Sequence, residues 1–125
     1  MKVSRIMNKA IVIEPDLTLK QASKIMSEKR IGSLIILNGD KITGIITERD
    51  IIKNVDKISC KVSSVMSKNV ITIDEAESLD NAALLMSKHE IKRLPVISRG
   101  KLVGIVTATD MLANSDSLNE SFLLE

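Results

Sequence analysis

The sequence predicts an α+β fold with mixed sheets, in which two β-α-β-β-α units pack with pseudo-two-fold symmetry. The first observation behind this prediction is an internal repeat, because residues 31–52 and 91–112 follow one pattern at an offset of 60. The second is that each copy alternates strand-like and helix-like segments in the same order. A unit of about 50 residues is marginal as an independent domain, so two copies would share the burial of apolar surface. Seven positions are identical, since Ile31, Leu34, Lys41, Gly44, Ile45, Thr47 and Asp50 recur as Ile91, Leu94, Lys101, Gly104, Ile105, Thr107 and Asp110.

The repeat extends over most of the 125 residues. Nearer the start the offset falls to 59, because VSRIM at 3–7 matches VSSVM at 62–66, which indicates one residue gained or lost in the first strand. We therefore expect one repeat at 1–57, a second at 58–113 and a separate C-terminal tail at 114–125. The two repeats would form one module.

Each repeat begins with a short strand and a helix. Apolar runs rich in β-branched residues predict strands at 10–13 and 70–73. Thr18 and Gln21 form a capping box and Ser78 is the equivalent N-cap, so a helix should begin after each cap. Apolar residues then recur at helical spacing; they are Leu19, Ala22, Ile25 and Met26 in the first copy and Leu79, Ala82, Leu85 and Met86 in the second.

A hairpin and a last short helix complete each repeat. Strands predicted at 34–37 and 42–46 flank the turn sequence at 38–40, and strands at 95–97 and 102–106 flank that at 98–100. The stretches GIITERD at 44–50 and GIVTATD at 104–110 then lead into the last helix of each copy. The Gly that begins each stretch lets the strand pass close to neighbouring backbone.

Both stretches end in Thr-x-x-Asp, formed by Thr47 with Asp50 and by Thr107 with Asp110. One interpretation is structural, because Thr is a good N-cap and an acceptor three residues later completes a capping box. The other is functional: a helix N-terminus suits anions, a Thr hydroxyl can bond a phosphate or sugar oxygen, and a carboxylate one turn on can accept both hydroxyls of a ribose. Ordinary capping boxes more often use Glu or Gln there, so Asp in both copies favours function. The residues alone leave both interpretations open.

Two units of this layout, each with G-h-h-T-x-x-D and the second with IKRLPVI at 91–97, resemble a tandem pair of CBS domains. These are regulatory modules named after cystathionine beta-synthase, and the resemblance covers about residues 1 to 113. It implies a disk-like pair with two clefts between the repeats that bind adenine nucleotides or related adenosyl compounds. The implied ligand is AMP, ADP, ATP or S-adenosylmethionine, with no obligatory cofactor.

The resemblance also implies the roles of individual residues. Asp50 and Asp110 would hold the ribose hydroxyls, while Thr47 and Thr107 would bond sugar or phosphate. The segment before the second strand of each repeat would line the cleft, and the first strands would meet the adenine through backbone and apolar contacts. These lining residues are Ile31, Gly32, Ser33, Ile91, Lys92, Arg93, Val12, Ile13, Thr72 and Ile73.

The repeats differ in positive charge beside the motif. Lys92-Arg93, before Leu-Pro-Val, matches a basic pair that meets phosphates in family members. The first repeat has Gly32-Ser33 there and Ile35 in place of the Pro, so it lacks this phosphate clamp. Arg49 could supply charge instead, although a solvated surface role stays open for Arg49 and for Lys92-Arg93. If only one cleft binds, we expect it to be the second.

Other kinds of site have little support. His89 is the only histidine, without a Cys or second His at ligand spacing, which favours a helix-end surface role over a metal ligand. Cys60 is the only cysteine, so neither a disulfide framework nor a multi-Cys metal site is expected. With one His there is no Ser-His-acid triad, and we expect no enzyme.

Composition narrows the partners further. A net charge of +2, with no Trp or Tyr and a single Phe, argues against a nucleic-acid partner. No apolar run approaches the length of a bilayer span and the N-terminus lacks a signal-peptide pattern, so we expect a cytoplasmic protein without a membrane partner.

The first functional hypothesis is a stand-alone regulatory module that senses an adenosine-containing ligand. Binding would bias the arrangement of the two repeats, and an effector protein in trans would respond to that shift. The alternative is a dimerisation or scaffold module with degenerate, non-binding clefts, in which both Thr-x-x-Asp motifs are only caps. Leu118 and Phe122, four apart in the tail, predict a short helix that docks on a second module, so we expect a homodimer; a disordered end is the alternative.

Overall fold

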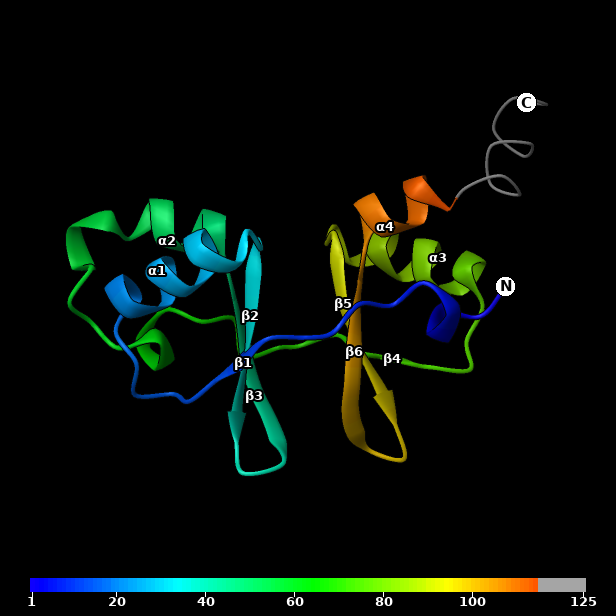
Figure 1. The fold of residues 1–125 in the computed structure, drawn as a ribbon, viewed down its shortest axis with the longest axis horizontal. Helices are drawn as coiled ribbons and strands as arrows, with labels where there is room; N and C mark the ends of the chain where they lie inside the picture. Colours follow the sequence, from blue (N-terminus) through cyan, green and yellow to red (C-terminus); the bar gives the residue numbers. More distant parts are fainter. Residues whose placement is uncertain (115–125) are drawn as a thin grey trace. The chain divides into compact units, whose positions relative to one another are not determined.

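The computed structural model describes residues 1–114, and these residues form two compact units. The first-repeat unit is Ala10–Val70, and the second-repeat unit combines Met1–Lys9 with the chain from Ile71 onward. Packing therefore does not follow the sequence repeats, because the N-terminal arm, Met1–Lys9, belongs with the second repeat (Figure 1). The tail helix expected around Leu118 and Phe122 lies outside the described residues.

The first-repeat unit has a three-stranded mixed sheet in the order β1-β2-β3. Strand β1 (Val12–Ile13) runs parallel to β2 (Ser33–Asn38), which pairs antiparallel with β3 (Lys41–Thr47). Helix α1 (Leu19–Lys29) connects β1 with β2, and α2 (Glu48–Lys53) follows β3 directly. The 3-10 helices η2 (Val55–Lys57) and η3 (Val62–Ser64) complete the unit.

The second-repeat unit has the same topology, with the sheet order β4-β5-β6. Its elements are β4 (Ile73–Asp74), α3 (Leu79–His89), β5 (Arg93–Ser98), β6 (Lys101–Thr107) and α4 (Ala108–Ala113). Its opening 3-10 helix, η1 (Val3–Arg5), comes from the N-terminal arm. The structure therefore confirms the predicted order of strands and helices in both copies.

The first strands are shorter than the predicted runs 10–13 and 70–73. Only two residues of each enter the ladder, at Ile13↔Ile36 and at the equivalent Ile73↔Val96, because the chain passes from one unit to the other just before them. The offset between the two repeats also changes, from 59 to 60, within these connecting segments. Asn8 and Ser67 occupy equivalent bridge positions, but Ile13 follows Asn8 by five positions and Ile73 follows Ser67 by six. The extra residue therefore lies between the bridge and the paired part of the first strand, in a segment that overlaps the predicted runs 10–13 and 70–73.

The predicted helix starts are confirmed. Thr18 and Gln21 form a complete capping box on α1, and the Ser78 side chain accepts a hydrogen bond from the Asn81 N–H on α3. Both helices end at residues in the left-handed conformation, Arg30 at φ 54° and Glu90 at φ 53°. No glycine marks these ends, so the sequence offered no signal for them.

The two hairpin turns differ in backbone conformation. In the first, only Gly39 has a positive φ, as the first central residue of a type II′ turn does. In the second, both Arg99 and Gly100 have a positive φ, as in a type I′ turn. Both turn types match the twist of the flanking strands. The strands of the two hairpins therefore pair in the same register, and each last helix begins at the equivalent residue.

Each unit has its own aliphatic core between its sheet and its helices. The first-repeat core contains Ile13, Leu19, Ala22, Met26, Leu34, Ile36, Ile46 and Val62. The second-repeat core contains Val3, Ile6, Ile73, Leu79, Ala82, Met86, Leu94, Val96, Val106 and Met111. Val3 is fully buried and Ile6 is 8% exposed, so the N-terminal arm is a structural part of the unit that it joins.

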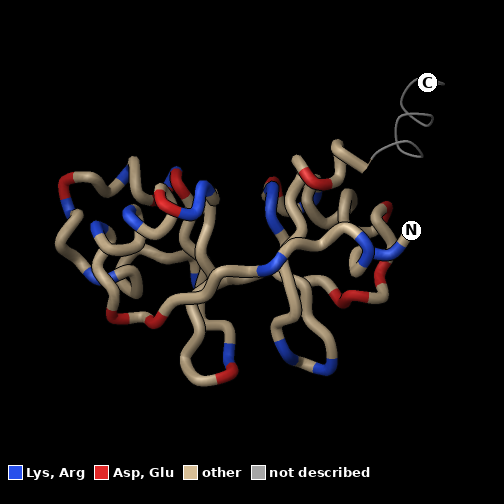
Figure 2. The backbone as a smooth tube through the Cα atoms, viewed as in Figure 1, with Lys and Arg blue, Asp and Glu red and all other residues tan. Residues whose placement is uncertain are grey.

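Residues of both charges are distributed along the backbone of each unit (Figure 2). Within residues 1–114 no helix is long and apolar enough to cross a membrane. The same part of the chain holds no group of three or more His, Cys, Asp or Glu side chains that could bind a metal ion. Cys60 is exposed and carries a free thiol.

Candidate functional site

In each unit the Thr-x-x-Asp residues and the two residues at the start of the second strand meet where the third strand of the sheet passes into the last helix. In the first-repeat unit β3 ends at Thr47, which pairs with Ser33 at the start of β2. The Glu48 N–H donates to the Gly32 carbonyl at 3.0 Å. Gly32, Ser33 and Thr47, distant in sequence, therefore lie together at the start of α2.

Thr47 and Asp50 form a complete capping box at this junction. The Thr47 N–H and hydroxyl both donate to Asp50 Oδ2, at 2.9 and 3.2 Å, and the Asp50 N–H donates to Thr47 Oγ1 at 3.4 Å. A carboxylate oxygen has two lone pairs, so protein donors fill both positions on Oδ2. No donor among residues 1–114 reaches Oδ1 of this half-buried carboxylate, which leaves two acceptor positions open there.

The junction in the second-repeat unit has the same backbone geometry. Thr107 pairs with Arg93, and the Ala108 N–H donates to the Lys92 carbonyl at 2.8 Å. The Thr107 N–H donates to Asp110 Oδ2 at 3.0 Å, and the Asp110 N–H donates to Thr107 Oγ1 at 3.1 Å. The Thr107 hydroxyl hydrogen, unlike that of Thr47, has no acceptor within the described chain, so it is available to a ligand.

Asn8 is a further residue of this junction, and sequence reasoning missed it. Its side-chain amide donates from Nδ2 to Asp110 Oδ1 at 2.8 Å, across 102 positions of the sequence. The equivalent residue in the first-repeat unit is Ser67, since Asn8 bridges Ile105 and Ser67 bridges Ile45. The alignment of 3–7 with 62–66 makes Asn8 and Ser67 equivalent, but it does not indicate in which unit each of them packs.

The first strands contribute little side-chain surface. Ile13 and Ile73 belong to the two cores and are 7% and 3% exposed, so a ligand could meet only their backbone. Val12 on β1 is exposed, and Thr72, directly before β4, is half-buried. On β4 itself the exposed side chain is that of Asp74.

The basic residues lie beside the junctions. Lys92 is exposed and Arg93 is half-buried at the start of β5, next to Thr107. Arg49 is exposed in the first turn of α2. None of the three has an ion-pair partner within residues 1–114, so these cations are available to an anion.

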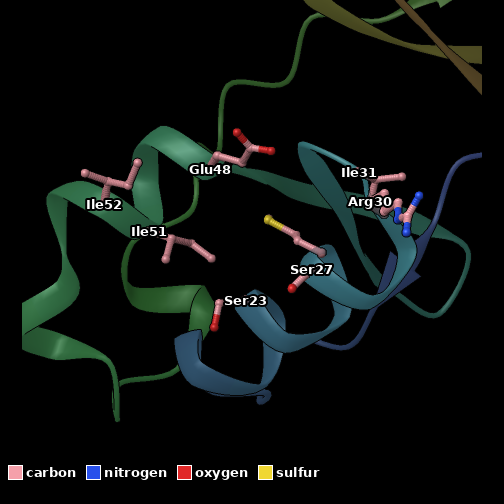
Figure 3. Close-up of a pocket in the computed structure, with 8 residues that line it drawn as sticks. Ser23, Ser27, Arg30, Ile31, Glu48, Ile51 and Ile52 are labelled. Carbon is pink, nitrogen blue, oxygen red and sulfur yellow. The ribbon is translucent and has the colours of Figure 1, made fainter.

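A separate pocket lies within the first-repeat unit, between α1 and α2 (Figure 3). It has a volume of about 380 Å³ and is lined by Ser23, Met26, Ser27, Arg30, Ile31, Glu48, Ile51 and Ile52. Of the residues predicted for the site, only Ile31 lines it; Thr47 and Asp50 do not. The pocket and the Thr-x-x-Asp junction are therefore different features of this unit.

The structural and functional interpretations of Thr-x-x-Asp are compatible. Both motifs are capping boxes, which confirms the structural interpretation. Both carboxylates nevertheless keep open acceptor positions, since capping occupies only part of each.

Comparison with known proteins identifies the architecture. A family model described as the CBS domain matches residues 3–57 and again residues 62–116. The chain belongs to the CBS-domain family. The predicted resemblance to a tandem CBS pair is confirmed, and CBS pairs of this kind are regulatory modules.

Relatives of this CBS pair include short and long proteins. Uncharacterized protein MJ1232 of Methanocaldococcus jannaschii is 39% identical over 101 residues, which is 80% of this chain and 34% of that protein. The CBS domain-containing protein YhcV of Bacillus subtilis is 32% identical over 87% of this chain and 80% of its own. Inosine-5′-monophosphate dehydrogenase of Thermoplasma acidophilum is 36% identical over 80% of this chain, which spans only 20% of that enzyme.

Crystal structures of other CBS pairs share the fold. The CBS domain pair of protein MJ0100, in complex with 5′-methylthioadenosine and S-adenosyl-L-methionine, matches with a TM-score of 0.87 and 32% identity, over 94% of this chain and 98% of that one. A hexameric CBS-CP12 protein from bloom-forming cyanobacteria matches with a TM-score of 0.86 and 28% identity, over 94% of this chain and 70% of that one. These likenesses confirm the predicted fold class.

Proposed function

We propose that this CBS pair binds an adenosine-containing ligand at its two Thr-x-x-Asp junctions and regulates a partner protein in response. The observation that carries the proposal is the carboxylate at the start of each last helix. Asp50 and Asp110 are half-buried and held by a capping box, yet each keeps open acceptor positions. The complex of the MJ0100 pair with two adenosyl compounds supports this ligand class.

Ribose recognition follows from the chemistry of the carboxylate. An ionised carboxylate accepts hydrogen bonds on both oxygens, and charge-assisted bonds of this kind are about twice as strong as neutral ones. The capping box holds the carboxylate in one orientation before a ligand arrives, which lowers the entropic cost of binding. A vicinal diol offers two hydroxyl donors on adjacent carbons, and it fits the acceptor positions that remain.

The two junctions should prefer different adenosyl compounds. In the second-repeat unit Lys92 and Arg93 stand next to the free hydroxyl of Thr107, and this arrangement suits the phosphates of AMP, ADP or ATP. The first-repeat unit has Gly32 and Ser33 at the equivalent places. Without that positive charge, its junction suits an adenosyl compound that carries no phosphate, such as S-adenosylmethionine.

We further propose that the protein acts as a homodimer in the cytoplasm and has no catalytic activity of its own. Ligand binding would shift the populations of two arrangements, and an effector protein in trans would bind one of them better. Ile52 on α2 and Val55, three residues later, are both large apolar residues on the surface, 72% and 66% exposed, and together they support a surface that is covered in an assembly. The hexameric CBS-CP12 neighbour shows that a protein with this fold can form oligomers.

A thermal-shift panel with AMP, ADP, ATP, S-adenosylmethionine and 5′-methylthioadenosine tests the proposal. A ligand at about 100 times its Kd stabilises the folded state by roughly 2.7 kcal/mol, which gives a measurable shift. Asp110→Asn and Asp50→Asn are the matched variants, because Asn keeps one oxygen for the cap and replaces the other with an NH₂ donor that cannot accept a hydroxyl. Each variant should lose the shift of the ligand bound at its own junction.

The alternative function makes the opposite prediction. If both motifs are only caps, as in a scaffold module, no adenosyl compound at millimolar concentration will shift the melting temperature. Unshifted melting across the whole panel would therefore exclude the sensor and leave the scaffold.

A further inference from the structure

The N-terminal arm brings a side chain to one of the two Thr-x-x-Asp motifs. Asn8 donates from Nδ2 to Asp110 Oδ1 at 2.8 Å, while Ser67, its equivalent, makes no such bond to Asp50. The Thr-x-x-Asp motif itself is the same in both copies. This difference in hydrogen bonding comes from the segments that carry Asn8 and Ser67, each of which packs in the unit of the other repeat.

The position of Asn8 is set by the packing of the whole arm. Val3 and Ile6 are buried in the second-repeat core, and the Val3 N–H donates to the Glu77 carbonyl at 2.8 Å. Asn8 itself exchanges two backbone hydrogen bonds with Ile105, at 2.8 and 2.9 Å. Because these contacts use only backbone and apolar groups, the Asn8 side chain can change without detaching the arm.

The hydrogen bond changes which acceptor positions stay open. On Asp110, Thr107 occupies one position of Oδ2 and Asn8 occupies one position of Oδ1, so one position remains on each oxygen. On Asp50, the two donors from Thr47 both bond Oδ2, so the open positions are both on Oδ1. Asp110 can take one hydroxyl on each oxygen, whereas Asp50 has to take both hydroxyls on the same oxygen.

We propose that Asn8 is a positioning residue for Asp110 and makes the second-repeat junction the more selective of the two for an intact vicinal diol. This inference rests on the proposed adenosyl function. The Asn8 amide holds Asp110 so that its two oxygens face the two ribose hydroxyls. Its carbonyl oxygen and second N–H remain available, so it also adds one acceptor and one donor beside the sugar. A ligand that lacks one hydroxyl leaves an Asp110 oxygen unpaired, and this costs binding free energy.

The test compares AMP with 2′-deoxy-AMP by isothermal titration calorimetry. In the Asp50→Asn background the first-repeat junction should no longer bind ligand, so the titration measures binding at the second-repeat junction alone. 2′-Deoxy-AMP loses one hydrogen bond to the charged Asp110, so the second-repeat junction should bind AMP about tenfold or more tightly than 2′-deoxy-AMP. Asn8→Ser gives the second-repeat junction the residue of the first, and it should reduce the preference to about threefold or less. Lys9→Ser is the matched control, because this exposed neighbour forms no hydrogen bond or ion pair with the motif within residues 1–114, and it should leave the preference unchanged.

The reciprocal substitution is an independent test of the same idea. Ser67→Asn in an Asp110→Asn background places an amide beside Asp50, and it should raise the preference of the first-repeat junction for AMP over 2′-deoxy-AMP. In addition, the side-chain amide NMR signals of Asn8 should shift in Asp110→Asn even without ligand, because their acceptor is replaced.

The possible outcomes separate the two proposals. If AMP does not bind the unaltered protein at millimolar concentration, the proposed nucleotide function of this junction fails and the inference fails with it. If AMP binds but Asn8→Ser keeps the full preference, the function stands and the role of Asn8 is wrong. If the Asn8 amide signals do not move in Asp110→Asn, the hydrogen bond is absent in solution and the inference is overturned without reference to any ligand.

Discussion

Replacing Gly104 with alanine should loosen the attachment of the N-terminal arm. Gly104 is buried on β6, where a Cβ atom would lie 2.8 Å from the backbone oxygen of Asn8 and 2.9 Å from Met7 Sδ. Real Cβ atoms essentially never approach other heavy atoms so closely. Since the nearest atom belongs to backbone, a rotamer change cannot relieve the clash, and the arm has to move away from β6.

The size of the effect follows from the contacts that this movement disturbs. Asn8 exchanges two backbone hydrogen bonds with Ile105, each worth about 1 kcal/mol net. Overpacking of a buried site costs about 1–3 kcal/mol. We therefore expect Gly104→Ala to lower the free energy of unfolding by about 2–4 kcal/mol, on the assumption that the two costs partly overlap.

The repeat supplies a matched control in Gly44→Ala. A Cβ at Gly44 would contact Met66 Sδ and lie 2.7 Å from Met66 Cγ, so the clash is with a side chain. Met66 is half-buried and has three flexible torsions, which allow it to turn aside. Alanine also restricts the unfolded chain, a gain of about 0.4–1 kcal/mol. Gly44→Ala should therefore stay within about 1 kcal/mol of the unaltered protein.

Urea unfolding followed by far-UV circular dichroism measures both variants, and a melt should place Gly104→Ala about 10 °C below Gly44→Ala. Limited proteolysis reports the arm directly, since cleavage after Arg5 or Lys9 should accelerate only in Gly104→Ala. Equal stability of the two variants, with the arm equally protected, would refute the argument that backbone contact distinguishes these glycines.

Three further substitutions test other parts of the structure. Thr18→Ala removes the capping box with Gln21 and should cost about 1 kcal/mol in urea unfolding; no change would mean that water replaces the cap. Glu90→Gly should raise the free energy of unfolding by about 1 kcal/mol, because φ is 53° at this residue and glycine adopts this conformation without strain. A lower free energy of unfolding would contradict this. Ile52→Asp should convert the proposed dimer to monomer in light scattering, whereas an unchanged mass would place the interface elsewhere.

The candidate site was only partly predictable. Thr47, Asp50, Thr107 and Asp110 follow from local spacing, because a cap and its acceptor lie three residues apart on one helical turn. Their pairing with 32–33 and 92–93 follows from the hairpin register. The charge difference between the junctions also follows from the sequence. Asn8 could not be deduced in the same way, because it depends on where the N-terminal arm packs.

The sequence by itself determined the repeat, the order of strands and helices, the N-caps of the helices and the apolar core positions of the two long helices. These features depend on hydrogen bonds within a few residues and on side-chain periodicity, which are written along the chain. Only the tertiary structure decided that the first residues of each repeat pack in the unit of the other repeat. It also decided that the two Thr-x-x-Asp motifs have different neighbours. Asn8 lies beside Asp110 because Val3 and Ile6 are buried in the core of the second repeat, and no local pattern specifies which core receives them. The chain therefore carries two copies of the Thr-x-x-Asp motif, and the packing of its first nine residues gives one of them a hydrogen-bond donor that the other lacks.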